Sequence, residues 1–425
     1  MRDWFRRTFK TLGPGFITGA ADDDPSGIAT YTQAGASLGY HALWTALFSV
    51  PFMIVVQEMC ARIGIVTGRG LGANMRRRFP YAVVLLLVSL LFAANTLNLG
   101  ADLGMMAAAT QLVLPLPFPL LVVCMALVTL ILQIFTTYRT YAKYLKWLTL
   151  SLFAYILVAF VVDDIQWWTA LRDTFLPSNF FQKETLMILV AVLGTTISPY
   201  LFFWQASEEV EEQWGEGRVP TKLTPSLRAR MMRRLHDMRA DVCTGMVFSN
   251  VVAWFIMLVA ASELHRAGST TILSADQAAQ ALAPLVGRFA SFVFALGILG
   301  TGLLTVPVLS ASAAYAICEL LDIPEGLSKK WYQAQAFYGL IVVSTLIGLA
   351  GNFVGVNPVR ALIYSSIVNA LVAPPLLIAI VYLASDKKTM GKYVSSRGMQ
   401  VFGWLAVLLM TGAPMLWAYA TWRGW

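Results

Sequence analysis

Residues 22–27 read Asp-Asp-Asp-Pro-Ser-Gly and lie inside an apolar stretch near the start of the chain. At ~1.5 Å per helical residue, Asp24 lies about 21 Å beyond Lys10, deep enough to reach the middle of a bilayer. An ionised aspartate there costs ~2.5–3.5 kcal/mol on insertion scales, so such residues usually serve a function. Pro25 lacks an N–H, and serine and glycine are poor helix formers, so we predict that the helix unwinds over residues 25–27. The freed carbonyls, a carboxylate and a hydroxyl together favour a hard cation.

A second apolar stretch is interrupted in a similar way, because residues 194–200 read Gly-Thr-Thr-Ile-Ser-Pro-Tyr. Thr195 and Ser198 supply hydroxyl groups just before Pro199, and a break here frees further carbonyl oxygens. The segment offers oxygen ligands but neither sulfur nor imidazole. The alternative is that Pro199 only kinks a continuous helix, with the hydroxyls bonding back to their own backbone.

Other polar residues within apolar stretches are open to two interpretations. Asn369, with Ser365 and Ser366 one turn earlier, either faces the cation or bonds helix to helix. Asp102 either lines a water path or bonds to a neighbouring helix. The predicted metal ligands are Asp24, Ser26, Gly27, Thr195, Ser198 and Asn369. No catalytic or cofactor-binding residue is predicted.

Asp22 and Asp23 have no assigned role at this stage. Adjacent helical residues point in different directions, so at most one of them faces the cavity around Asp24. Asp22 and Asp23 fit three roles equally well: they attract cations from outside, bond to neighbouring helices, or bind the ion. For Asp24 the alternative is a structural ion pair, which the absence of lysine and arginine from the middle of the apolar stretches disfavours.

The composition is that of a membrane protein. Of 425 residues, 58% are hydrophobic and 13% are charged, whereas soluble proteins contain about 25% charged residues. Apolar runs near the ~20 residues that a helix needs to cross a bilayer recur along the chain. We predict an all-α polytopic protein of about eleven spans, at residues 12–40, 42–66, 80–110, 117–138, 142–163, 185–207, 238–262, 286–318, 332–351, 358–384 and 400–422.

The basic residues are distributed unevenly between the two sides of these spans. With the N-terminus in the cytoplasm, the inner segments contain most of them, including the arginines at 76–78 and the stretch 218–239. The positive-inside rule therefore predicts a cytoplasmic N-terminus. Topology and anionic lipid explain the formal charge of +8, which disfavours a nucleic-acid partner. Residues 208–239 form the one sizeable predicted loop. Its acidic start at residues 208–212 is interpreted as a solvated face, with an exit for cations as the alternative.

The first and sixth spans are five apart, so they cross the membrane in opposite directions. Paired interrupted helices indicate an inverted-repeat transporter with a site near the midplane. We predict one domain over residues 1–425, with repeats at about 12–163 and 185–384 and an extra helix at about 400–422. A cation channel also uses acidic residues, but the paired breaks favour a carrier. An intramembrane aspartyl protease needs two facing carboxylates and commonly a Gly-x-Gly-Asp signature, which the sequence lacks, so no enzyme is predicted.

Several motifs resemble the Nramp divalent-metal transporters, and the likeness covers nearly the whole chain. Residues 13–40, GPGFITGAADDDPSGIATYTQAGASLGY, resemble the first helix of that family, whose site carries Asp-Pro-Gly-Asn. ARIGIVTGRGLGANMRRRFP at 61–80 and APPLLIAIVYLASDKKTMG at 373–391 resemble the ends of its second and tenth helices. Residues 194–200 stand where the family has Gly-Ala-Thr-Val-Met-Pro-His. The resemblance implies a LeuT-like fold of five plus five helices and one extra.

The departures from the family pattern lie at its metal site. Gly27 stands in the place of the asparagine ligand, Ser198 in that of the methionine and Tyr200 in that of the histidine. Met105 replaces an acidic residue tied to proton movement, and Ser366 replaces a glutamine. A thioether favours softer transition metals, so its loss removes discrimination against Mg²⁺. Mg²⁺ dehydrates reluctantly, and a roomier oxygen-lined site suits it.

This pattern is similar to the Nramp-related magnesium transporters (NRMT), a prokaryotic branch of the family. The resemblance implies a secondary transporter of the prokaryotic plasma membrane that imports partly hydrated Mg²⁺, and also Mn²⁺, by alternating access without proton coupling. The alternative is a proton-coupled Mn²⁺/Fe²⁺ transporter of the Nramp type. In either case the metal is cargo rather than a resident cofactor, the partners are divalent metal ions and the lipid bilayer, and no oligomer is implied.

Overall fold

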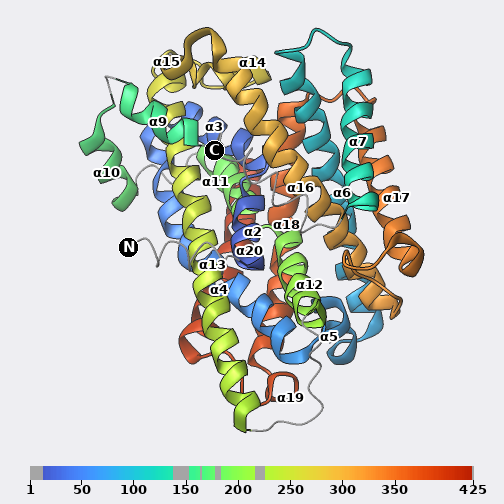
Figure 1. The fold of residues 1–425 in the computed structure, drawn as a ribbon. Coiled ribbons are helices and arrows are strands. Elements are labelled where there is room, and N and C mark those ends of the chain that lie inside the picture. The colour runs from blue at the N-terminus through green and yellow to red at the C-terminus, as the bar shows by residue number, and fades with distance from the viewer. Residues whose placement is uncertain (1–12, 137–152, 163–164, 178–182, 216–224, 424–425) are drawn as a thin grey trace.

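The computed structural model describes residues 13–136, 153–162, 165–177, 183–215 and 225–423 (Figure 1). Within these ranges every regular element is a helix, as the sequence predicts. In the described part of the chain, eight helical stretches are long and apolar enough to cross a membrane. They are α4 (Trp44–Thr67), α6 (Tyr81–Gln111), α7 (Phe118–Phe135), α11 (Lys183–Thr196) with α12 (Pro199–Gly215), α13 (Pro225–Ala260), which a π-helical turn at Ala261–His265 extends, α16 (Ala290–Leu321), α18 (Pro358–Ser385) and α20 (Arg397–Arg423).

Shorter helices complete the described chain. One of them, the apolar helix α17 (Gln335–Gly351), has 17 residues. The predicted span 142–163 lies largely outside the described residues, and α9 is its described part. The shorter helices are α2 (Pro14–Asp22), α3 (Pro25–Leu38), α5 (Leu71–Arg78), α9 (Phe153–Val161), α10 (Trp167–Phe175), α14 (Ala275–Gln280), α15 (Ala283–Val286), α17 (Gln335–Gly351) and α19 (Lys387–Met390).

The first predicted span is broken, but earlier than the sequence suggests. α2 ends at Asp22, Asp23 and Asp24 are non-helical, and Pro25 is already the first residue of α3. Unwinding over residues 25–27 is therefore wrong. Proline fits the first helical position because its missing N–H would be unpaired there, and aspartate is a favoured N-cap. The helix accordingly restarts at the proline rather than stopping at it.

The sixth predicted span is broken in the same manner. α11 ends at Thr196 and α12 begins at Pro199, with Ile197 and Ser198 between them. The proline again begins a helix, so the alternative of a continuous kinked helix is wrong. Both breaks thus have the same form: a short non-helical gap closed by a proline at the first helical position.

The two broken helices lie side by side in the middle of the molecule (Figure 1). α2 packs against α12, and α3 packs against α11. The first half of one helix thus contacts the second half of the other, as two antiparallel helices do. This supports the predicted inverted repeat, whose boundaries stay a prediction. α6 and α18 also contact α3 and so enclose the breaks.

The predicted loop over 208–239 is wrong where the chain is described. α12 continues to Gly215, and α13 begins at Pro225 and runs for 36 residues. At ~1.5 Å per residue that is about 54 Å, longer than the ~30 Å hydrocarbon core, so α13 extends well beyond a bilayer. A high charge content ends an apolar span but does not end a helix, because lysine, arginine and glutamate are good helix formers.

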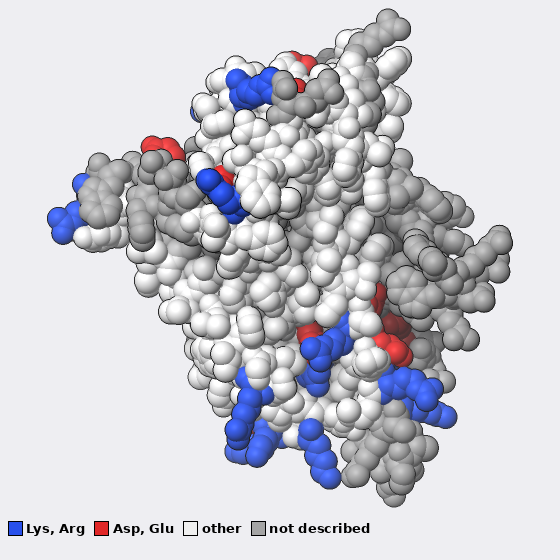
Figure 2. Space-filling model, turned by 90° about the vertical axis from the view of Figure 1, so that its left-hand side faces the viewer, with Lys and Arg blue, Asp and Glu red and all other residues white. Residues whose placement is uncertain are grey.

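Basic side chains gather at one end of the molecule. Figure 2 shows lysine and arginine concentrated at the lower end, where Figure 1 places α5, α19 and the start of α13. α5 contributes Arg76, Arg77 and Arg78, and α19 contributes Lys387 and Lys388. The middle of the surface in Figure 2 is almost free of charge, as expected of a lipid-facing band.

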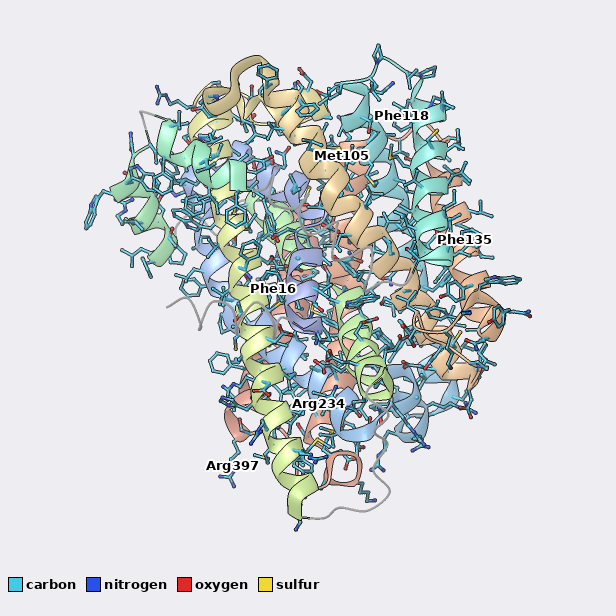
Figure 3. The ribbon with its side chains drawn as sticks, in the orientation of Figure 1. Phe16, Met105, Phe118, Phe135, Arg234 and Arg397 are labelled. Atoms are coloured by element: carbon cyan, nitrogen blue, oxygen red, sulfur yellow. The ribbon has the colours of Figure 1, made fainter. Side chains whose placement is uncertain are left out.

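Close contact between α2 and α13 depends on glycine. The ring of Phe16 on α2, labelled in Figure 3, lies 5.8 Å from that of Phe248 on α13. A Cβ added at Gly19 would lie 2.3 Å from the carbonyl oxygen of Gly245. Small residues that let backbones approach are a general device of helix packing in membranes.

Gly19→Ala is expected to lower the free energy of unfolding by about 1–3 kcal/mol, because the added methyl group overpacks this contact. The measurement is the thermal unfolding midpoint of the purified protein in detergent. Gly339→Ala is the matched control: Gly339 lies in α17 with open space at its Cβ, so the change should leave the midpoint unchanged or raise it. Equal midpoints for both variants would contradict the packing argument.

Candidate cation-binding site

Asp24 lies in the gap between α2 and α3 and is 1% exposed. As the N-cap of α3, its carboxylate accepts the Gly27 N–H at 2.5 Å. The Ser26 hydroxyl lies 2.7 and 2.8 Å from its two oxygens, and the amide nitrogen of Asn98 donates at 3.2 Å. The partial positive charge at the N-terminal end of α3 adds to these donors. Neutral groups therefore hold the carboxylate and leave its negative charge for a cation.

Asn98 of α6 is a site residue that the sequence analysis missed. Its amide nitrogen contacts Asp24, and its amide oxygen accepts the Ser365 hydroxyl of α18 at 2.6 Å. A single side chain thus connects α3 to α18 through α6. The spacing of Asn95, Asn98 and Asp102 at intervals of three and four residues was the available signal, since it places all three polar residues on one face of an apolar helix.

The second break contacts the first through hydroxyl groups. The Thr195 Oγ1 atom lies 3.3 Å from the Ser26 Oγ atom. The hydroxyls of Thr196 and Ser198 donate instead to carbonyl oxygens of their own helix. Of the predicted ligands in this segment, Thr195 is the one whose side chain bonds directly to the surroundings of Asp24; Ser198 keeps a free lone pair on its oxygen.

α18 supplies further oxygen atoms. The Ser366 hydroxyl lies 3.2 Å from the Thr30 hydroxyl of α3, one turn beyond Ser26. Asn369 is 0% exposed, and neither its amide oxygen nor its amide nitrogen has a hydrogen-bond partner among the described residues. An unpaired buried amide costs ~1–3 kcal/mol per group, so a side chain left in this state indicates a ligand or water that satisfies it.

Gly27 has a specific steric role at the break. A Cβ added there would lie 3.2 Å from the Asp22 carbonyl oxygen and 3.3 Å from both Asp24 Oδ1 and Tyr31 Cε2. Its N–H is also the shortest donor to Asp24. The absence of a side chain therefore lets the backbone approach the carboxylate closely.

Of the remaining acidic residues of this region, Asp22 and Asp23 face α13, and Asp102 lies close to Asp24 and Ser26. Asp22 and Asp23 both contact the Ser249 hydroxyl of α13, at 2.8 and 3.1 Å. Asp102 of α6 is 0% exposed, and neither of its carboxylate oxygens has a hydrogen-bond partner among the described residues. Met105, labelled in Figure 3, is equally buried and lies one turn further along α6.

Among the described residues, no three or more histidine, cysteine, aspartate or glutamate side chains converge at a common point suited to a metal ion. The candidate site instead centres on the Asp24 carboxylate, with neutral hydroxyl and amide groups around it. Such a donor set suits a hard cation that keeps some of its water, because too few protein oxygens are present to replace a full hydration shell.

A cavity of about 680 Å³ lies at the basic end of the molecule and does not include the Asp24 site. It is lined by acidic residues of α12, α16 and the segment after α16, with Arg69, Arg76, Arg77 and Lys329 also on its wall. Glu211 of α12 accepts the backbone N–H groups of Leu327 and Ser328 at 2.6 and 2.9 Å. Burial, together with the neighbouring Glu319 carboxylate, raises the pKa of Glu325 to about 10.

The prediction that residues 208–212 form a solvated acidic face is therefore wrong for two of them. Glu209 and Glu211 are 2% and 8% exposed. Both lie on the side of α12 that faces the protein, where Gln205 donates to Glu209 at 3.1 Å and backbone amides donate to Glu211. A run of glutamates on a helix places some members inward, because successive residues point in different directions.

Paired interrupted helices that meet around a buried carboxylate define a carrier of the LeuT-like fold class. The sequence matches the family described as natural resistance-associated macrophage protein-like (Nramp) over residues 15–419. This chain belongs to the Nramp family. The predicted family membership and fold class are confirmed, whereas assignment to the NRMT branch stays a prediction.

Curated relatives of similar length support this membership. A divalent metal cation transporter MntH of Mesorhizobium japonicum is 26% identical, with 97% of this chain and 89% of the relative covered. A divalent metal cation transporter MntH of Verminephrobacter eiseniae is 28% identical, with coverage of 93% and 85%. Both alignments extend over nearly the whole of this chain.

Solved structures agree with the fold. A manganese transporter of Eremococcus coleocola superposes with a TM-score of 0.79 at 18% identity, covering 99% of this chain and 87% of the other. Mhp1, a nucleobase-cation-symport-1 family transporter, superposes with a TM-score of 0.58 at 14% identity, covering 96% and 93%. At these identities the likeness is one of fold.

Asn98→Ala is expected to weaken divalent-cation binding about 10- to 100-fold, because groups that orient a metal ligand typically carry that much affinity. The measurement is calorimetric titration of the purified protein with Mn²⁺. Asn95→Ala is the matched control on the same helix, since Asn95 bonds to the Leu309 carbonyl and to Ser312 rather than to Asp24. Equal losses in both variants would show that α6 packing, not the contact with Asp24, is responsible.

Proposed function

We propose that this chain transports divalent metal cations across the prokaryotic plasma membrane by alternating access. The observation that carries the proposal is the Asp24 carboxylate, fully buried where the two helix breaks meet and held only by neutral donors. A buried charge without a basic partner needs a cation to compensate it. The names of the curated relatives, divalent metal cation transporters, agree with this function.

The proposed cargo is Mn²⁺, with Mg²⁺ as a competing cargo. The related solved structure is of a manganese transporter, which favours Mn²⁺ over the magnesium preference that the sequence analysis placed first. The donors around Asp24 are all oxygen atoms, and Mg²⁺ and Mn²⁺ both accept octahedral oxygen coordination. Nothing in this donor set excludes Mg²⁺, so both ions are expected to bind.

Proton coupling separates the two candidate functions. Met105 is buried and apolar at a position where the family resemblance places an acid, which favours uncoupled transport. Asp102, one turn earlier on α6, is a buried carboxyl group without a described partner, which favours a proton-coupled Mn²⁺/Fe²⁺ transporter. Internal pH followed during Mn²⁺ uptake into proteoliposomes decides between them: acidification supports coupling, and a constant pH supports uncoupled transport.

The proposed orientation places the basic end of the molecule in the cytoplasm. Lysine and arginine gather at that end (Figure 2), and the sequences of α5 and α19 contribute some of them. The positive-inside rule then directs the cavity of about 680 Å³ at that end toward the cytoplasm as well.

Asp24→Asn is expected to reduce Mn²⁺ uptake into proteoliposomes by at least about 100-fold, because removing one partner of a buried charge pair costs ~3–5 kcal/mol. Mg²⁺ added in excess should inhibit uptake by the unaltered protein. Asp276→Asn in the exposed part of α14 is the control and should transport normally. Full uptake by the Asp24 variant would overturn the site, and insensitivity to Mg²⁺ would overturn the second cargo.

Ser198→Cys is expected to shift selectivity about tenfold from Mg²⁺ toward Cd²⁺, since it places a soft sulfur atom at the second break with little change in volume. The measurement is the ratio of the concentrations of the two ions that halve Mn²⁺ uptake. Ser344→Cys is the matched control: Ser344 is also buried and bonds to its own helix, but lies on α17. An unchanged ratio in the Ser198 variant would place that side chain outside the cation's reach.

A further inference from the structure

Asp22 and Asp23 form a pair of buried acidic residues, separate from Asp24, on the side of the first break that faces α13. The Ser249 hydroxyl lies 2.8 Å from Asp22 Oδ2 and 3.1 Å from Asp23 Oδ1. Both side chains are 0% exposed, and Asp22 Oδ1 and Asp23 Oδ2 have no hydrogen-bond partner among the described residues. One hydroxyl donates one proton, so it does not satisfy both carboxylates.

Asp24 and the pair Asp22 and Asp23 lie at helix ends of opposite partial charge. Asp24 caps the N-terminal end of α3, whose partial positive charge stabilises a carboxylate. Asp22 is the last residue of α2, and Asp23 follows it. The C-terminal end of a helix carries partial negative charge, which disfavours carboxylates and favours cations. Asp22 and Asp23 therefore lack the stabilisation that Asp24 receives from the partial positive charge at the start of α3.

Tyr31 is an independent indication of a ligand at the same place. Its side chain is 0% exposed, and its hydroxyl has no hydrogen-bond partner in the described part of the chain. Its ring lies beside Gly27 at the start of α3. A Cβ added at Gly27 would lie 3.2 Å from the Asp22 carbonyl oxygen and 3.3 Å from Tyr31 Cε2, so the tyrosine ring lies beside the end of α2. Two carboxylates and the Ser249 hydroxyl thus offer oxygen atoms on the α13 side of the break, and the buried Tyr31 side chain lies near the end of α2.

We propose that Asp22, Asp23 and Ser249 bind a second cation, a monovalent ion such as Na⁺, separate from the divalent cargo at Asp24. Half-helix C-terminal ends are a general location for Na⁺ in transporters built from broken helices. The ion joins the end of α2 to α13.

The inference rests on the proposed function only in treating Asp24 as the cargo ligand, so Na⁺ binding is measured without cargo. The purified protein in detergent and a divalent-cation chelator is titrated with ²²Na⁺, with choline chloride keeping the ionic strength constant. We expect saturable binding of about one Na⁺ per chain and a rise in the thermal midpoint. Ser249→Ala is expected to weaken Na⁺ binding at least about tenfold, and Asp23→Asn to abolish it.

Controls separate ligation from folding. Ser262→Ala is the matched control in the π-helical turn that follows α13, because the Ser262 hydroxyl bonds to the Leu258 carbonyl of the same helical segment. It should bind Na⁺ normally, and Ser249→Thr should restore binding by restoring the hydroxyl. Absence of saturable Na⁺ binding, or equal binding by the two alanine variants, overturns the proposal. A second equivalent of Mn²⁺ bound in calorimetry and lost in Asp23→Asn overturns the monovalent assignment.

The two proposals fail separately. Asp24→Asn should lose Mn²⁺ binding and retain Na⁺ binding, because the Asp24 donors lie on α3 and α6 while Ser249 lies on α13. Na⁺ binding with no Mn²⁺ transport would remove the proposed function and leave the second site standing. Mn²⁺ transport with no Na⁺ binding would do the reverse.

Discussion

A carboxylate that is removed from water inside a membrane must be stabilised by something other than water, and the way Asp24 meets this requirement organises the centre of the molecule. A basic partner would neutralise the charge and leave nothing for a cation. Here the donors are a backbone N–H, a hydroxyl and an amide, all neutral. They come from α3 and α6, while hydroxyls of α11 and α18 lie at the next contacts. The negative charge is thus held without being cancelled.

That arrangement requires helices to approach unusually closely, which small residues permit. A Cβ added at Gly194 of α11 would lie 1.9 Å from the Ser366 carbonyl oxygen of α18. Gly19 and Gly245 allow the same approach between α2 and α13. In a bilayer the helices gain little from burying apolar surface, so backbone proximity and interhelical hydrogen bonds supply the association. The glycines near the breaks therefore let the helices that carry the site residues approach one another.

The sequence predicted the two breaks and their pairing because glycine, proline and acidic residues are rare inside apolar spans. It placed the first break two residues late, since proline was interpreted as a terminator although it also starts helices. Asn98 was missed because Asp102 was considered alone, without the polar face that it forms with Asn95 and Asn98 on the same helix. Which side chains meet across helices depends on helix rotation, which single-span patterns do not specify. The orientation of Ser198 toward its own backbone is an example.

Selectivity between cations depends on which ligand atoms the two helix breaks supply. Mg²⁺ and Mn²⁺ have similar demands for oxygen ligands, so a site of carboxylate, hydroxyl and amide oxygens separates them poorly. Discrimination would need either a softer atom or a rigid shell of fixed size. The Asp24 site has one firmly held carboxylate and, at Asn369, an amide with no described partner, so its shell is only partly built by protein. In the proposed function water completes the coordination of the bound ion, and we expect such a shell to accept an ion that keeps its water readily, as Mg²⁺ does.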